Sequence, residues 1–269
     1  MAEPALSPCA EAVRAADPDM FLAAMFAPEP LRERLMVLIA FDIELSRAVH
    51  RRAEPVIAAM RLQWWRDVVA EAVAGAPPRE HEVARPLALM IRGAGLCAGD
   101  LDPMIAGREI ELDAPFTPER FDAWAAARFG GLLAAGCRLA AVRAERAAQV
   151  AGRAMAVSFA LRHARAMAGE GVYLLPMAGL DRAALSRAET TPGLRSLAAG
   201  LAGDAIARRR ALPRRGVPGR AKPVLRLGWR SWRQLRTAQK PDMDLARDFL
   251  NPPGGAAPRL TWMALSGGW

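Results

Sequence analysis

The chain has 269 residues, enough for one large domain with a sizeable buried core. Alanine supplies 58 residues and aromatic residues only 6%, which favours helices and argues against sandwiches, barrels and propellers. Hydrophobic residues at 52% and charged residues at 24% exclude a disordered chain. The net charge of +9 is local, because segment 208–240 holds twelve Lys or Arg and no acid, whereas the rest holds 25 bases and 28 acids.

Cysteine usage and the absence of long apolar runs indicate the compartment. Cys9, Cys97 and Cys137 lie far apart without a CxxC pair, so neither a disulfide framework nor a zinc site is predicted. The N-terminus shows no basic region followed by an apolar stretch, so no signal peptide is expected. No uncharged run approaches the ~18 apolar residues that a spanning helix needs. We therefore expect a cytoplasmic protein, peripheral on the inner face of the membrane.

Helical periodicity dominates the chain, and neither strand alternation, an internal repeat nor an interior linker is visible. Asp17-Pro18 is typical of an N-cap followed by proline at the first helical position. The expected helices, in chain order, cover residues 18–27, 31–52, 55–74, 82–92, 101–111, a helix from 117, then 145–170, 193–210 and 224–240. The sequence predicts one all-α domain over 1–250 and a Pro/Gly-rich loop or tail over 251–269.

Several short segments carry a pattern more specific than periodicity. They are Phe21–Ala27, Leu38–Phe41, Arg61–Asp67, Met104–Leu112, Phe129–Gly131, Gly152, Leu161–Arg162 and Val172–Pro176. Their order and spacing resemble the squalene/phytoene synthase family from about residue 18 to 176, and more faintly to about 250. The resemblance implies an all-α bundle of the isoprenoid synthase type around a central cavity, in agreement with the periodicity.

Active members of this family condense two prenyl diphosphates, using Mg²⁺ held by two DxxxD motifs on facing helices. The i, i+4 spacing places both carboxylates of a motif on one helix face, where they supply the oxygen ligands that Mg²⁺ prefers. Here the resemblance aligns the motifs with Ser46-Arg47-Ala48-Val49-His50 and His163-Ala164-Arg165-Ala166-Met167, and neither contains an acid. We therefore predict no metal site and no cofactor, with Mg²⁺ expected only for an active enzyme.

The resemblance also implies which residues line the cavity. Asp42 lies four residues before Ser46, and we expect it to be solvated or paired with arginine. A transition-metal site at His50 and His163 would need a third ligand, Cys137 or Met167, and the spacing supports neither. The predicted cavity residues are Asp42, Ser46, His50, Trp65, Arg162, His163, Met167 and Tyr173.

The end of the basic segment is amphipathic, with Trp229 and Trp232 on an apolar stripe and arginines beside it. One interpretation is a final bundle helix that packs its apolar face on the core. The other is an interfacial helix on anionic lipid, with Trp at headgroup depth. In that case the membrane contacts are Arg226, Trp229, Arg230, Trp232 and Arg233. No nucleic-acid module is visible, so no nucleic-acid partner is expected.

One branch of the family has lost the same motifs, namely the squalene/phytoene synthase-like assembly factor of mitochondrial respiratory complex I and its bacterial relatives. Segment Met60–Arg66 resembles that branch. It implies a catalytically silent accessory protein at the membrane that acts in complex I assembly, with a complex I subunit as partner and an isoprenoid or lipid as ligand. The alternatives are an active head-to-head prenyl-diphosphate transferase with remodelled metal ligands, and a lipid or isoprenoid carrier.

Overall fold

The structure is a computed structural model that describes residues 6–49, 54–213, 216–250 and 256–269. Within these ranges every regular element is a helix, and the one extended feature is an isolated bridge between Phe116 and Pro176. The prediction of an all-α fold is confirmed. None of the described helices is long and apolar enough to cross a membrane.

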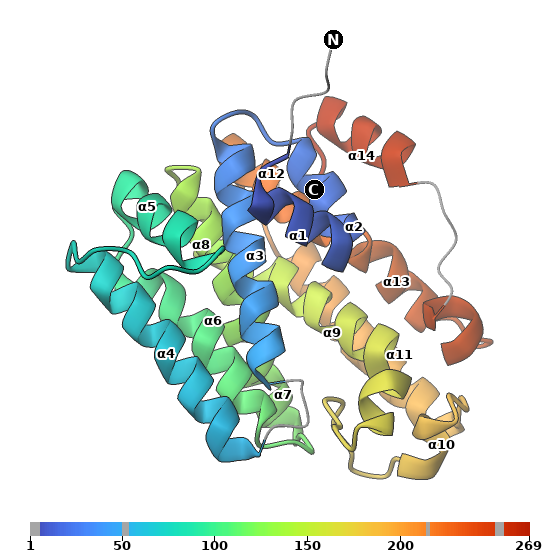
Figure 1. Cartoon of the computed structure of the whole chain (residues 1–269). Coiled ribbons are helices and arrows are strands. Elements are labelled where there is room, and N and C mark those ends of the chain that lie inside the picture. The colour runs from blue at the N-terminus through green and yellow to red at the C-terminus, as the bar shows by residue number, and fades with distance from the viewer. Residues whose placement is uncertain (1–5, 50–53, 214–215, 251–255) are drawn as a thin grey trace.

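The helices differ in length, and Figure 1 shows how they surround the long helix α9. The elements of the first half are α1 (Pro8–Ala16), α2 (Pro18–Met25), α3 (Leu31–Val49), α4 (Pro55–Val73), α5 (Ala84–Ala94), α6 (Ala98–Glu111), α7 (Pro118–Trp124), the π-helical η1 (Ala125–Gly130) and α8 (Gly131–Leu139). Those of the second half are α9 (Glu145–Gly169), α10 (Arg182–Ser186), α11 (Pro192–Arg210), η2 (Gly219–Ala221), α12 (Lys222–Leu225), η3 (Arg226–Gly228), α13 (Ser231–Ala238), η4 (Ala246–Leu250) and α14 (Ala256–Leu265).

Local sequence signals fix several helix starts. Asp17 caps α2 by accepting a hydrogen bond from the backbone N–H of Met20 at 2.9 Å, and proline takes the first helical position. The hydroxyls of Thr117 and Thr191 cap α7 and α11 in the same way. Helix α1 was not predicted, although Ser7 caps it as well.

Helix α9 forms the centre of the bundle, and η1, α8, α11 and α13 pack against it. Glycines allow the backbones to approach closely. A Cβ atom on Gly107 of α6 would lie 2.6 Å from the backbone N of Arg128, and one on Gly152 of α9 would lie 2.5 Å from the backbone N of Gly130. Because no side chain intervenes at these points, the π-helical turn η1 is clamped between α6 and α9.

The C-terminal third differs from the sequence prediction in two places. Residues 224–240 do not form one helix, since the short elements α12, η3 and α13 follow each other there. Gly228 of η3 lies so close to α9 that a Cβ on it would be 2.8 Å from Met155 Cγ. The prediction of a loop is also wrong for residues 256–265, which form α14 and bury Leu260. The prolines and glycines on which the prediction rested lie outside the described residues.

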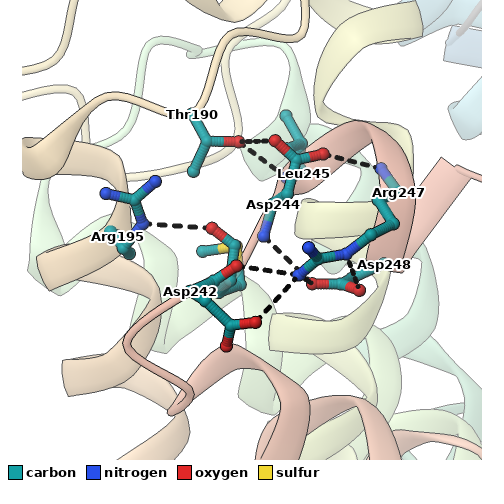
Figure 2. Close-up of polar contacts among 8 residues, drawn as sticks. Thr190, Arg195, Asp242, Asp244, Leu245, Arg247 and Asp248 are labelled. Atoms are coloured by element: carbon teal, nitrogen blue, oxygen red, sulfur yellow. Dashed lines mark hydrogen bonds and ion pairs between the residues drawn. The ribbon is translucent and has the colours of Figure 1, made fainter.

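Figure 2 shows polar contacts that fasten η4 to the segment before α11. The Thr190 hydroxyl donates to Asp244 at 3.3 Å and accepts a hydrogen bond from the backbone N–H of Leu245 at 2.7 Å. Arg247 binds both carboxylate oxygens of Asp248 at 2.9 Å, and Asp248 accepts from the backbone N–H of Asp244 at 3.0 Å. We call Thr190, Asp244, Arg247 and Asp248 the polar clasp.

The polar clasp predicts a pH-dependent effect of Asp248→Asn. Hydrogen bonding to Arg247 lowers the pKa of the Asp248 carboxyl below its usual value. The ionised group therefore stabilises the fold above its unfolded-state pKa of about 3.9, and this contribution is lost as pH falls through the lower folded-state pKa. We expect Asp248→Asn to reduce the free energy of unfolding at pH 7 by about 1 kcal/mol, and the difference from wild type to vanish near pH 2, by urea denaturation. Asp242→Asn is the control, because that side chain is 74% exposed and its carboxylate lies 3.6 Å from Arg247, so its removal leaves the hydrogen bonds of the polar clasp in place. A wild-type advantage that stays constant with pH would contradict the prediction.

Candidate functional site

A cavity of about 410 Å³ lies between α3 and α9, the two helices that carry the segments aligned with the metal motifs. Its wall includes Asp42 and Ser46 from α3, and His163 and Met167 from α9. The structure thus brings together four of the residues that the sequence placed in one cavity. His50 lies outside the described residues. We call this space the central cavity.

Part of the wall belongs to a buried ionic network. Arg108 is 0% exposed, and its Nη2 lies 2.9 Å from Oδ1 and 3.1 Å from the carbonyl oxygen of Asp42. Its Nη1 donates to both carboxylate oxygens of Glu111 at 3.2 and 3.3 Å. Glu111 Oε1 also accepts from Arg128 and from the indole N–H of Trp124, each at 2.8 Å. Two arginines thus face two carboxylates, and such pairing is what makes burial of the charges tolerable.

Aromatic rings surround the second arginine of this network. The Arg128 guanidinium carbon lies 4.1 Å from the ring centroid of Phe159 and 4.6 Å from that of Phe129. Burial and the neighbouring charge of Arg108 lower the pKa of Arg128 to about 10. For Arg108 itself burial acts in the same direction, but the carboxylates of Asp42 and Glu111 keep its pKa above the usual value. Both arginines are therefore protonated at neutral pH.

The remaining acids of the cavity wall are Asp17 and Glu170. Asp17 is the N-cap of α2, and burial raises the pKa of its carboxyl above the usual value. In the same wall, the imidazole of His163 contacts the ring of Phe159 at an interplanar angle of 36°, with 4.3 Å between ring centroids. The wall therefore combines paired charges with aromatic and thioether surface.

The donor set of the central cavity does not fit magnesium. Mg²⁺ demands hard oxygen ligands in near-octahedral geometry, whereas Ser46, His163 and Met167 occupy the motif positions. Asp42, one helical turn before the first motif, is bound to Arg108, and Glu44 is bound to Arg47. In the part of the chain that the structure describes, no group of three or more His, Cys, Asp or Glu side chains is placed to hold a metal ion.

Three of the predicted cavity residues lie elsewhere, so the prediction is wrong for them. Trp65 faces a second pocket between α3 and α4. Arg162 extends to Asp19, 3.9 Å away, and Tyr173 lies beneath the Arg182 guanidinium at 5.1 Å. Residues adjacent in a helix point about 100° apart, so a side chain next to a cavity residue of α9 faces another neighbour.

The structure also corrects the predicted membrane contacts Arg226, Trp229, Arg230, Trp232 and Arg233. Trp229 and Trp232 are each 4% exposed, and Arg226 is buried with its Nε donating to a backbone carbonyl at 2.9 Å. Arg230 is ion-paired with an aspartate of α2 at 2.8 Å. Only Arg233 of the five is exposed. The segment therefore packs as part of the bundle, and its indoles are buried in the core and face no lipid.

Sequence reasoning missed the two arginines that organise the central cavity. Arg108 lies within one of the family-like segments, and its i, i+3 spacing to Glu111 was the available signal of an ion pair. Arg128 gave no comparable signal, because hydrophobic periodicity does not reveal a π-helical turn such as η1.

The buried ionic network predicts a large effect of Arg108→Met. The substitution leaves the Asp42 carboxylate without its partner, and removal of one member of a buried ion pair costs about 3–5 kcal/mol. We expect a decrease of this size in the free energy of unfolding, measured by urea denaturation at pH 7. Arg85→Met is the control, because Arg85 is exposed. A decrease below about 1 kcal/mol would show that the network does not hold these helices together.

Comparisons with known proteins agree with this architecture. The sequence pattern of the squalene/phytoene synthase family matches residues 13–241. A crystal structure of a dehydrosqualene synthase in complex with ligand superposes with a TM-score of 0.78 at 16% identity, covering 96% of this chain and 93% of that one. Squalene synthase HpnC from Alicyclobacillus acidocaldarius superposes with a TM-score of 0.65 at 15% identity, covering 96% and 92%. These identities establish the isoprenoid synthase-type fold alone.

Curated relatives match a shorter region. Assembly factor 6 of NADH dehydrogenase (ubiquinone) complex I from Bos taurus is 30% identical over 105 residues, which is 39% of this chain and 31% of that protein. The Homo sapiens protein is 29% identical over the same length. The match thus spans about a third of these relatives (31%). Since the family pattern extends over most of the sequence, this chain belongs to the squalene/phytoene synthase family.

Proposed function

We propose that this protein is a catalytically silent family member that assists the assembly of respiratory complex I, peripheral on the inner face of the membrane. The observation that carries the proposal is the bound state of Asp42. This carboxylate lies beside the first degenerate motif, and Arg108 holds it at 2.9 Å. The likeness to assembly factor 6 supports the complex I role, with a complex I subunit as the partner.

The chemistry of the family explains why the pairing of Asp42 with Arg108 favours a protein without catalytic activity. Ionising an allylic diphosphate requires stabilisation of the departing negative charge, which preorganised Mg²⁺ provides in active relatives. Arginines of the central cavity are paired with carboxylates, as Arg47 is with Glu44 and Arg108 with Asp42. An arginine that attracts a diphosphate equally in the ground state and in the transition state strengthens binding but does not accelerate the reaction. An isoprenoid or lipid bound in the central cavity fits this role.

The second candidate is an active prenyl-diphosphate transferase with remodelled ligands. Three carboxylates, those of Asp17, Asp42 and Glu170, line the central cavity, and this favours it. Two observations argue against this candidate. Asp42 is ion-paired with Arg108, and the raised pKa of Asp17 makes its carboxylate a weaker metal ligand.

The proposed function predicts loss of assembled complex I when the gene is deleted, with full rescue by wild type and by Ser46→Ala, since the motif position performs no chemistry. Native gels stained for NADH dehydrogenase activity measure this. The purified protein, given farnesyl or geranylgeranyl diphosphate and Mg²⁺, is expected to release no pyrophosphate above background. Mg²⁺-dependent formation of a squalene- or phytoene-like product by the unmodified protein would establish the transferase instead. Normal complex I in the deletion strain would refute the assembly role.

The membrane part of the proposal rests on a basic surface shared by α13 and α14. Arg233 and Arg236 are exposed on α13, and burial together with the charges of these two arginines lowers the pKa of Arg259 on α14. On the same helix Trp262 and Leu265 are 70% and 81% exposed. Basic and large apolar side chains together are typical of an interfacial helix on anionic lipid.

This surface predicts salt-sensitive binding to vesicles that contain anionic lipid. Each base near an anionic surface contributes about 1 kcal/mol, so replacing Arg233, Arg236 and Arg259 by Gln is expected to weaken binding about 100-fold. Co-sedimentation at low and high salt measures this. A charge-matched control replaces Arg14, Arg85 and Arg143, which are exposed elsewhere. Equal weakening by both triple variants would mean that net charge alone, and no defined surface, drives binding.

A further inference from the structure

We infer that the second pocket, between α3, α4 and the loop before α5, binds a small amphiphile that carries one carboxylate. This pocket has a volume of about 550 Å³, within the usual range of small-molecule sites. Its walls include Arg61, Trp64, Trp65 and His81, none of which lines the central cavity. We call it the aromatic pocket.

Three aromatic rings form its apolar wall. The indoles of Trp64 and Trp65 meet edge to face, with centroids 4.8 Å apart and an interplanar angle of 85°. The His81 ring lies 5.6 Å from the first indole and 5.3 Å from the second. Phe41 of the core supports Trp65 from behind at 5.3 Å, and the Arg79 guanidinium packs over Trp64 at 5.2 Å. Such rigid rings offer contact area to a hydrocarbon body at little entropic cost.

Two polar groups beside this wall are available to an anion. Arg61 is exposed and forms no ion pair with any described residue, whereas its neighbour Arg47 is bound to Glu44. His81 Nδ1 accepts hydrogen bonds from the backbone N–H groups that follow it, at 3.1 and 3.4 Å. The ring proton is therefore on Nε2, which donates to no described residue. One cation and one neutral donor match one carboxylate.

The charge of the wall also selects a monoanion. Glu44 and Arg47 cancel, so Arg61 leaves an excess of one positive charge in the aromatic pocket. A doubly charged phosphate ester would leave one negative charge without a partner, which is unfavourable beside apolar surface.

An exposed apolar surface extends from the pocket along α4. Ile57 and Met60 are 43% and 68% exposed, and Ile57, Arg61 and Trp64 follow each other at i, i+4 and i+7 on one helix face. Large apolar side chains clustered in this way mark binding surfaces. A hydrocarbon chain whose carboxylate binds Arg61 therefore has apolar surface on both sides of that residue.

Titration of the full-length protein with laurate below its aggregation concentration, followed by isothermal titration calorimetry, tests the proposal. We expect saturable one-to-one binding, with dodecanol and dodecylamine at least about tenfold weaker, because neither supplies a negative charge for Arg61. Arg61→Gln and Trp64→Ala are each expected to weaken laurate binding at least about tenfold. Arg143→Gln is the matched control and is expected to change nothing, because Arg143 is exposed and lines neither pocket.

Three outcomes would overturn the proposal. The first is laurate binding that Arg61→Gln leaves unchanged, a readout that needs no folding assumption because Arg61 is exposed. The second is loss of laurate binding on Ala166→Leu, which adds volume in the central cavity and would locate the ligand there. The third is the absence of laurate binding together with Arg61-dependent binding to anionic vesicles, which would assign the surface to a membrane lipid. Laurate binding tests only the aromatic pocket, and the native gels of the deletion strain test only the role in complex I assembly. The two proposals can therefore be refuted independently.

Discussion

A buried guanidinium needs carboxylate partners close by, because water cannot solvate its charge. In this protein the guanidinium in that position is Arg108. Its side chain joins α6 to α3 through Asp42, and the shared carboxylate of Glu111 then brings in η1 through Arg128. Because the energy of a buried ion pair depends on good geometry, these helices have little freedom to shift. The central cavity takes its shape from this restriction.

The same restriction explains how an isoprenoid synthase-type fold holds together where Ser46, His163 and Met167, and no carboxylate, occupy the described motif positions. Unpaired carboxylates that line one cavity repel each other unless a cation lies between them. Carboxylates that are already paired with arginines need no such cation. Close backbone contact reinforces the arrangement, since Gly107 and Gly152 let α6 and α9 enclose η1 directly. Packing and internal ion pairs thus maintain the shape of the central cavity.

The sequence predicted the fold class and most helix boundaries, because caps and periodicity are local signals. It also placed Ser46, His163 and Met167 around one cavity by alignment with the family motifs. It did not resolve the segment around Trp229 and Trp232, since an apolar stripe beside arginines fits a bundle and a membrane surface equally well. Only distant neighbours decide between the two, and no periodicity within the segment encodes them.

Helix α2 contacts the segment just before α13, although the two are far apart along the chain. The indole N–H of Trp229 donates to the carbonyl of Asp19 at 3.4 Å, and Arg230 pairs with the carboxylate of the same residue at 2.8 Å. Contacts of such sequence separation carry a high loop-closure cost and tend to form late in folding. During synthesis, α2 therefore has no partner on this side until some two hundred further residues have left the ribosome, and its apolar face stays open to chaperones for that interval.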